Sequence, residues 1–248
     1  MSNVLFNNAL NRVPQKTPPI WFMRQAGRYH SHYQNLKEDY SFEELCKNPE
    51  LAAQTALGPI NDFDFDVSIL FSDILFPLEA LGMDLKYNPG PIFGKFINNS
   101  NYDELKTAEE AVFDLTFQSE ALKITREILP KNKSLIGFVG GPWTVASYGT
   151  GMNKGVNHKG NFKNDFIFKL LTKKIIPLLK RNIELQISSG AEIVMIFDTD
   201  ASRIENKKDF YDYSNLVYEN LIKPFDRKVG FFAKHPFCLL YTSDAADD

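Results

Sequence analysis

The chain alternates short apolar runs with longer stretches that have the hydrophobic period of a helix. This alternation is typical of βα units, in which helices cover a parallel sheet, so we expect an α/β fold. The predicted strands are Ile20–Met23, Val67–Phe71, Leu135–Val139, Ile193–Phe197 and Val229–Ala233. The predicted helices are Phe42–Leu57, Ala108–Ile128, Phe166–Ser188 and Phe210–Ile222. Ser41 and Glu44 have the spacing of a capping box at the first helix, and Asn88–Gly94 is expected to be an exposed loop or a short β excursion.

The composition limits the class of protein. With 248 residues, 44% of them hydrophobic, the chain can bury the core of one barrel-like α/β domain. Its formal net charge of -3 argues against a nucleic-acid surface and against a patch for anionic membranes. Two cysteines, Cys46 and Cys238, are too few for a disulfide framework and favour a reducing cytoplasm. No targeting signal is visible, and polar residues interrupt the richest apolar run, Val67–Leu81, so no membrane span is expected.

An apolar run ends abruptly in two arginines in the segment Pro19–Tyr29. Arg24 and Arg28 are four positions apart, with Gln25-Ala26-Gly27 between them. A guanidinium stays protonated near neutral pH and presents a planar fork of donors, so this pair predicts a pocket for carboxylate or phosphate. Gly27 is expected to let the backbone turn tightly and to free amide N–H groups for the same pocket. The alternative is two solvated arginines on the first turn of a helix.

Two further segments carry distinctive motifs. Asp66–Leu75 is an apolar run that ends in Phe-Ser-Asp-Ile-Leu, and Gly137–Tyr148 contains Gly-Gly-Pro-Trp-Thr. Together with Met-Arg-Gln-Ala-Gly-Arg-Tyr at residues 23–29, these motifs resemble, in the same order, the signatures of the uroporphyrinogen decarboxylase family. The resemblance covers the chain from about Pro18 to about Tyr148, with a weaker echo in Gly190–Thr199. It implies an α/β fold of the (β/α)8 TIM barrel type.

The predicted strands account for about five of the eight βα units of such a barrel, each of which takes about 30 residues. About three units, roughly 100 residues, are then missing on the C-terminal side. The last stretch, from Cys238 to Asp248, fits no continuation of the family pattern. We therefore expect one partial barrel domain over residues 1–237 and a non-native tail over residues 238–248, joined after about Pro236. A chain truncated in this way is expected to be inactive by itself.

The resemblance implies a carboxy-lyase of heme biosynthesis. It would remove CO₂ from the four acetate side chains of uroporphyrinogen III, leaving the methyl groups of coproporphyrinogen III. Losing CO₂ leaves electrons that need a sink, which most decarboxylases take from a cofactor, whereas a protonated pyrrole ring can be its own sink. The chain has no lysine in a pyridoxal-type context and no phosphate-binding glycine loop, so no cofactor is expected. The resemblance also implies a cytoplasmic enzyme that is a homodimer when full length.

Asp73 stands at the end of a predicted barrel strand, the side on which barrel enzymes build their active sites. From the residues alone it could equally be the N-cap of the following turn. The resemblance implies that its carboxylate accepts hydrogen bonds from the pyrrole N–H groups and stabilises the cationic ring. Tyr148 is implied to bind a substrate carboxylate, although without the motif it would be taken for a half-buried tyrosine at a barrel rim. Thr199 stands where the family usually has serine, and its hydroxyl is an implied substrate contact.

The resemblance assigns the substrate's carboxylates to Arg24 and Arg28 as catalytic residues, with Gln25, Ala26 and Gly27 lining the same site. Arg24 is also implied as a proton donor, but an arginine with a pKa above about 12 is a poor general acid, so we favour anchoring. Beyond Thr199, the small-residue turn of the family is replaced by Asp200-Ala201-Ser202-Arg203, which leaves the contacts of this loop open.

None of the four histidines, His30, His32, His158 and His235, occupies the family's C-terminal histidine motif. His30 and His32 are expected to be solvated, and no metal site is expected. Two other functions remain open. One is a corrinoid-dependent methyltransferase of the same superfamily, which activates a thiol on zinc and for which His235 and Cys238 have a suggestive spacing. The other is an inactive fragment or a non-catalytic tetrapyrrole binder, because missing strands would expose sheet edges.

Overall fold

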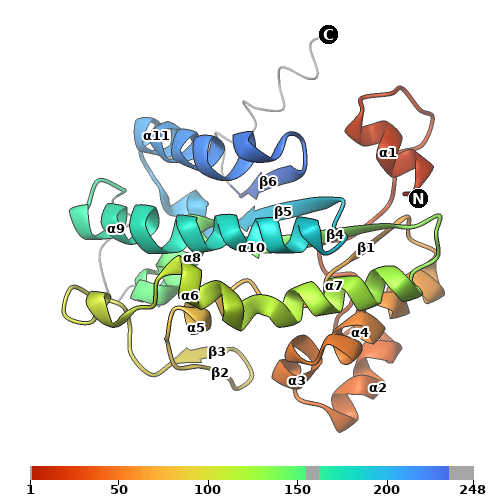
Figure 1. The fold of residues 1–248 in the computed structure, drawn as a ribbon, viewed down its shortest axis with the longest axis horizontal. Coiled ribbons are helices and arrows are strands. Elements are labelled where there is room, and N and C mark those ends of the chain that lie inside the picture. Colours follow the sequence, from red (N-terminus) through yellow and green to blue (C-terminus); the bar gives the residue numbers. More distant parts are fainter. Residues whose placement is uncertain (1, 155–161, 235–248) are drawn as a thin grey trace. The chain divides into compact units, whose positions relative to one another are not determined.

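Four of the five predicted strands form one sheet in the part of the chain that the computed structural model describes, residues 2–154 and 162–234. The strands are β1 (Val67–Ile69), β4 (Ser134–Gly140), β5 (Ile193–Asp198) and β6 (Val229–Ala233), in the order β1-β4-β5-β6 (Figure 1). β1 and β4 run parallel, with Val67 opposite Ser134. Every residue of β4 is buried, as expected for a strand of a parallel sheet that helices cover on both faces. The predicted α/β class is confirmed.

The prediction of a first strand at Ile20–Met23 is wrong. The segment is irregular, and most of its apolar side chains are exposed. Ile20 makes a reciprocal contact with Asp66: its N–H donates to the carboxylate at 2.8 Å, and its carbonyl accepts from the Asp66 N–H at 3.0 Å. The residue after Asp66 is Val67, the first residue of β1. Its carbonyl accepts from the side-chain amide of Gln25 at 3.1 Å. A side chain therefore occupies the edge of β1 at which a backbone ladder would continue.

The predicted helical stretches are all helical, but most are divided. They form α3 (Phe42–Lys47) and α4 (Pro49–Phe63), α6 (Ala108–Ala111) and α7 (Thr116–Ile128), α9 (Asp165–Leu170) and α10 (Ile176–Ser188), and α11 (Lys207–Val217). Single π-helical turns follow α9 and α11, at Leu171–Ile175 and Tyr218–Ile222. Short helices that the periodicity did not predict are α1 (Val4–Leu10), α2 (Ser31–Asp39), α5 (Phe76–Ala80) and α8 (Pro142–Thr150). The predicted β excursion is a hairpin of β2 (Leu85–Tyr87) and β3 (Pro91–Phe93).

Local capping explains where the first helices begin. The predicted capping box is confirmed: the Ser41 hydroxyl accepts from the Glu44 N–H at 3.2 Å, and the Glu44 carboxylate accepts from the Ser41 N–H at 2.8 Å. The break between α3 and α4 falls at Asn48-Pro49. Asn48 caps α4 through its side chain, and Pro49 restricts the residue before it to extended backbone, so one helix ends and the next begins.

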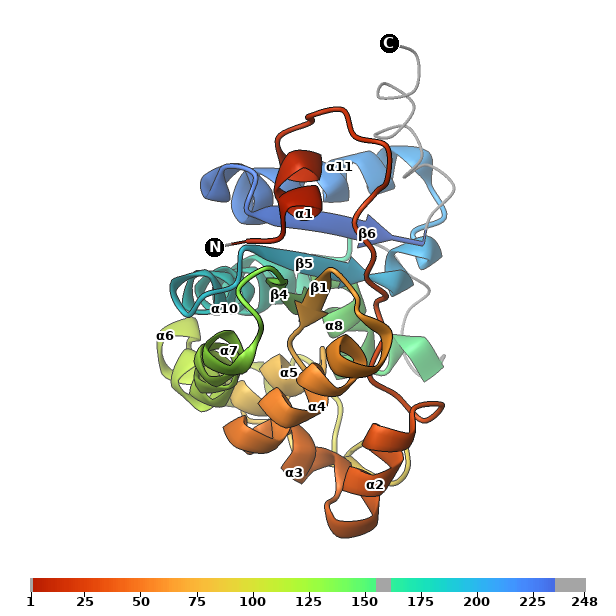
Figure 2. The ribbon, with the colours of Figure 1, turned by 90° about the vertical axis from the view of Figure 1, so that its right-hand side faces the viewer.

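The described chain forms two compact units. Unit 1 comprises residues 2–73, 115–138 and 183–194; unit 2 comprises residues 74–114, 139–154, 162–182 and 195–234, so β4 and β5 run through both. Within unit 1, α2, α3 and α7 pack against α4, which packs on β1 (Figure 2). Within unit 2, β6 packs against the π-helical turn that follows α11, and both β6 and α8 pack against the turn after β5. Among the described residues, no helix has the length and apolarity that a membrane crossing requires.

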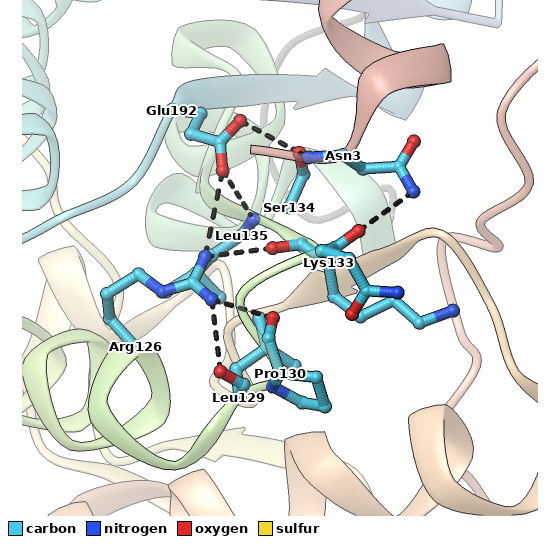
Figure 3. A network of polar contacts seen from close by, with 9 residues as sticks. Asn3, Arg126, Leu129, Pro130, Lys133, Ser134, Leu135 and Glu192 are labelled. Atoms are coloured by element: carbon cyan, nitrogen blue, oxygen red, sulfur yellow. Dashed lines mark hydrogen bonds and ion pairs between the residues drawn. The ribbon is translucent and has the colours of Figure 1, made fainter. Parts of the chain in front are cut away.

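A polar network joins separate segments of unit 1 at the start of β4 (Figure 3). The Glu192 carboxylate accepts from the Ser134 hydroxyl at 2.8 Å and from the Leu135 N–H at 3.2 Å, and it lies 3.7 Å from the Arg126 guanidinium. The Asn3 N–H donates to the Ser134 hydroxyl at 3.0 Å, which attaches the N-terminal segment. These residues lie at the amino ends of the strands, the side of a barrel fold that serves stability. The candidate site is therefore to be sought at the carboxyl ends.

Candidate active site

One buried glutamine holds the segment Arg24–Arg28, here called the arginine turn, against β1 in unit 1. Gln25 is 1% exposed. Its side-chain oxygen accepts from the Phe22 N–H at 3.2 Å, and its side-chain nitrogen donates to the Val67 carbonyl at 3.1 Å. The backbone carbonyl of Gln25 accepts from the Tyr29 hydroxyl. Because the arginine turn has no regular secondary structure, these contacts fix its backbone together with two turn bonds, from the Gln25 N–H to the Phe22 carbonyl at 3.2 Å and from the His30 N–H to the Gly27 carbonyl at 2.9 Å.

The two arginine side chains project from this turn into solvent. Arg24 and Arg28 are both exposed. Within the described part of the chain, neither guanidinium takes part in an ion pair or donates a hydrogen bond. The Arg28 carbonyl accepts from the Gln34 side chain at 2.6 Å, so the backbone at the end of the turn is fixed while the charged group stays open. Both planar forks of donors can therefore meet carboxylates of a ligand.

Gly27 does not shape the arginine turn, and the expectation that it would do so is wrong. Its backbone does not adopt a positive φ, and a Cβ at this position would have no neighbour closer than 3.7 Å. An alanine would fit. The turn depends on the buried side chain of Gln25 and not on the conformational freedom of glycine. Ala26 and Gly27 are both half-buried beside the arginines.

Asp73 lies in the loop between β1 and α5, beyond the carboxyl end of the strand, and is half-buried. The N-cap of α5 is Leu75, two residues beyond Asp73. The preceding residue, Ser72, accepts a hydrogen bond from the buried Gln118 side chain of α7 at 2.9 Å. This contact holds the Asp73 loop to the helix layer of unit 1.

Two buried groups connect Arg28 and Asp73 electrostatically. Burial raises the pKa of the Tyr33 hydroxyl, with a smaller increase from Cys46, while the positive charge of Arg28 lowers it. Burial also raises the pKa of the Cys46 thiol well above its usual value, and the Asp73 carboxylate raises it further. The charge of Arg28 thus acts on Tyr33, and the charge of Asp73 acts on Cys46.

Tyr148 belongs to unit 2 and lies on α8. Every other residue of α8 is buried, and Tyr148 alone is partly exposed. The N-cap of the helix is Gly141, and the backbone there approaches the end of β5 closely: a Cβ on Gly141 would lie 2.1 Å from the Asp198 side-chain carboxyl carbon. Glycine is required at this position because any side chain would overlap the carboxylate.

Asp198, at the end of β5, is a completely buried carboxylate that the sequence did not single out. It accepts from the Thr144 N–H at 2.8 Å, from the Thr144 hydroxyl at 2.7 Å and from the Tyr213 hydroxyl. Burial raises the pKa of Asp198, and these hydrogen bonds oppose that rise. In the sequence, the one sign that Asp198 belongs to the site is its position after an apolar strand and directly before Thr199. Tyr213 gave no such signal, since it lies in α11.

Thr199 is half-buried and opens the 3₁₀ turn Thr199–Arg203. The next residue, Asp200, accepts from the Ser147 hydroxyl at 2.6 Å, and its own N–H donates to the Thr144 hydroxyl at 3.0 Å. Thr199 and Tyr148 are thus joined within unit 2 through the residues beside them. The predicted site residues fall into two groups: the arginine turn with Asp73 in unit 1, and Tyr148 with Thr199 in unit 2.

The expectation that His30 and His32 are both solvated is wrong for His30. His30 is buried and lies 2.6 Å from the carboxylate of Asp62. His32 is half-buried and lies 3.0 Å from the Gln54 carbonyl. No group of three or more histidine, cysteine or acidic side chains suited to a metal ion occurs among the described residues. His158, His235 and Cys238 lie outside the described residues.

The chain is similar to proteins of one family along most of its length. A family model described as "Uroporphyrinogen decarboxylase (URO-D)" matches residues 1–241. A protein from Campylobacter jejuni named uroporphyrinogen decarboxylase is 39% identical over 231 residues, which are 89% of this chain and 67% of that protein. One from Orientia tsutsugamushi is 40% identical over 92% of this chain and 67% of its own length. One from Campylobacter hominis is 42% identical over 82% of this chain and 62% of its own length. The chain thus spans about two thirds of these relatives.

Among solved structures, the fold is similar to that of a methyltransferase from Methanosarcina mazei. The TM-score is 0.74 at 19% sequence identity, over 97% of this chain and 71% of the methyltransferase. At this identity the likeness concerns the fold alone.

Proposed function

Because the chain belongs to the uroporphyrinogen decarboxylase family, we propose that its full-length form acts as a carboxy-lyase on uroporphyrinogen III in heme biosynthesis. The reaction removes CO₂ from the four acetate side chains and gives coproporphyrinogen III. The main support at the level of residues is the arginine turn, on which Gln25 is locked in the core while Arg24 and Arg28 present unpaired guanidiniums among the described residues. A substrate with eight carboxylates needs fixed cationic groups of this kind.

The pyrrole ring supplies the electron sink of the proposed reaction. Protonation of the ring carbon beside the acetate-bearing position makes the ring cationic. The electron pair of the bond to the carboxylate then flows into the ring as CO₂ leaves. A second proton adds to the exocyclic carbon to make the methyl group, and the ring carbon gives back its own proton, which restores the pyrrole. No metal or organic cofactor is needed for this sequence of steps.

In this reaction Asp73 stabilises the cationic ring. A fixed carboxylate near the ring N–H groups accepts their hydrogen bonds and places a negative charge beside the developing positive one. The contact between Ser72 and Gln118 and the position of Asp73 beyond the carboxyl end of β1 support this role. Arg28 and Asp73 both belong to unit 1, which supports a shared site.

Arg24 and Arg28 hold substrate carboxylates, with Gln25, Ala26 and Gly27 forming the backbone wall beside them. Each guanidinium can bind a carboxylate with two parallel N–H donors. Tyr148 donates to a further carboxylate, because it is the one residue of α8 with an exposed portion. Thr199 contributes its hydroxyl from the start of the turn after β5. We further propose that the protein is cytoplasmic and that its full-length form is a homodimer.

The methyltransferase alternative has less support. The likeness to the Methanosarcina mazei enzyme concerns the fold alone, whereas relatives named uroporphyrinogen decarboxylase are 39–42% identical. The histidine and cysteine that suggested zinc, His235 and Cys238, lie outside the described residues.

The purified chain tests the proposal in an anaerobic calorimetric titration with uroporphyrinogen III, followed by chromatography of the oxidised products. We expect saturable binding that is weakened by Arg24→Ala and by Arg28→Ala. Exposed Arg227→Ala is the matched control, because it removes a guanidinium of unit 2 remote in sequence from both motifs. If all three substitutions weakened binding equally, the effect would come from the loss of positive charge in general, and the role assigned to the arginine turn would be refuted.

A further inference from the structure

We propose that Asp198 is the positioning residue that holds Tyr148 and Thr199 in place for the substrate; this inference rests on the proposed function. Asp198 itself is completely buried and cannot reach a ligand. It acts by joining the start of α8 to the end of β5, so that the two substrate-facing residues on these elements keep a constant relative geometry.

Asp198 supplies the N-terminal cap that α8 lacks. The N-cap residue, Gly141, has no side chain with which to accept from the first-turn amides. The Thr144 N–H, three positions beyond Gly141, donates instead to Asp198 at 2.8 Å. The Trp143 N–H, two positions beyond, donates to the Tyr213 hydroxyl at 2.9 Å, and that hydroxyl donates in turn to Asp198. One buried carboxylate therefore satisfies two first-turn amides, one directly and one through a tyrosine.

The negative charge of Asp198 also suits its place. The N-terminal end of a helix carries a partial positive charge, which favours an anion beside it. Asp198 receives the Thr144 N–H, the Thr144 hydroxyl and the Tyr213 hydroxyl as donors. An asparagine would keep one acceptor oxygen, and its N–H₂ group would face the donors that the second carboxylate oxygen now accepts from. At least one buried donor would then lose its partner.

The same network reaches both substrate-facing residues. Thr199 stands between Asp198 and Asp200, and both of these acidic residues are bonded to Thr144. Asp200 also accepts from the hydroxyl of Ser147, the residue before Tyr148. Thr199 is therefore fixed from both sides, and Tyr148 is fixed through its neighbour on the helix. Loss of Asp198 should loosen Tyr148 and Thr199 together.

Hydrogen exchange of the whole chain tests the connection without any ligand. In Asp198→Asn, we expect the amides of Thr144 and Asp200 to exchange at least about tenfold faster, while β1 and α4 keep their protection. Thr144→Val is a milder variant that removes only the hydroxyl, and Thr144→Ser should restore the protection of Asp200. Val217→Ala, which removes packing from α11 without touching the network, is the control for general destabilisation. Unchanged exchange of both amides in Asp198→Asn and Thr144→Val would overturn the proposal.

A double-mutant cycle tests the functional part. Tyr148→Phe should weaken the binding of uroporphyrinogen III about tenfold in the otherwise unchanged chain, because a hydrogen bond to a carboxylate is lost. In the Asp198→Asn background, where α8 has lost its buried cap, the same substitution should weaken binding less than about threefold. Equal fold-changes in both backgrounds would show that Asp198 serves stability alone and would overturn the positioning role. If the unchanged chain binds no porphyrinogen, the proposed function fails, and the exchange experiment still decides whether Asp198 fixes α8.

Discussion

Replacing Gln25 with alanine should destabilise the fold by about 2–4 kcal/mol and detach the arginine turn from β1. The larger part comes from the Val67 carbonyl, which sits on a completely buried residue and loses its donor; an unsatisfied buried acceptor costs about 1–3 kcal/mol. The smaller part, about 1 kcal/mol, comes from the Phe22 N–H, because Phe22 is 58% exposed and water can replace the lost acceptor. The loosened turn should also weaken carboxylate binding by Arg24 and Arg28.

Urea unfolding, followed by circular dichroism, measures the loss of stability, and calorimetric titration with uroporphyrinogen III measures the loss of affinity. Two controls isolate the role of Gln25. Gln34→Ala removes a single exposed hydrogen bond to the Arg28 carbonyl and should change stability by less than about 0.5 kcal/mol. Gly27→Ala should be equally mild, because the position has room for a Cβ at an ordinary φ. The reasoning is refuted if Gly27→Ala costs more stability than Gln25→Ala.

Three further predictions concern the chemistry. Arg28→Lys keeps the net charge at -3 but loses the planar fork, so the KM or Kd for the octacarboxylate should rise about tenfold; an unchanged value would leave Arg28 as a simple point charge. In the full-length enzyme, Asp73→Asn should lower kcat by the factor that corresponds to a loss of about 3 kcal/mol of transition-state stabilisation and should alter product affinity much less; a mutant with normal kcat would exclude an electrostatic role. Dialysis of the full-length enzyme against a chelator should leave turnover unchanged, whereas activity that is lost and then restored by zinc would move the assignment to the methyltransferase branch.

Local patterns were enough to predict most of the regular structure. The apolar runs that begin at Val67, Leu135, Ile193 and Val229 are β-strands, because a parallel sheet buries whole runs and each run carries its own signal. The capping box at Ser41 was equally local, since its two partners are three residues apart. The arginine turn was also visible, as a break from apolar to charged residues, although its role stays a prediction.

The failures occurred where a residue distant in the sequence decides the conformation. Ile20–Met23 has the composition of a strand, but its Ile20 N–H donates to the Asp66 carboxylate, and the side chain of Gln25 takes the Val67 carbonyl of β1. The tightness of the arginine turn was attributed to Gly27, while the structure assigns it to a buried glutamine whose acceptor is on β1. Neither contact leaves a periodic or local trace in the sequence, since each depends on which segment lies next to which.

The sequence by itself determined the family, four strands of the sheet, the longer helical stretches and the location of the arginine turn, because motifs, hydrophobic period and caps act over a few residues. Only the tertiary structure decided how α8 is capped. Gly141, Asp198 and Tyr213 come from three segments, and nothing in any one of them predicts that a carboxylate at the end of β5 replaces the missing cap of a helix that follows β4. The physical reason is that buried donors must find acceptors wherever the fold places them, and that requirement operates through space.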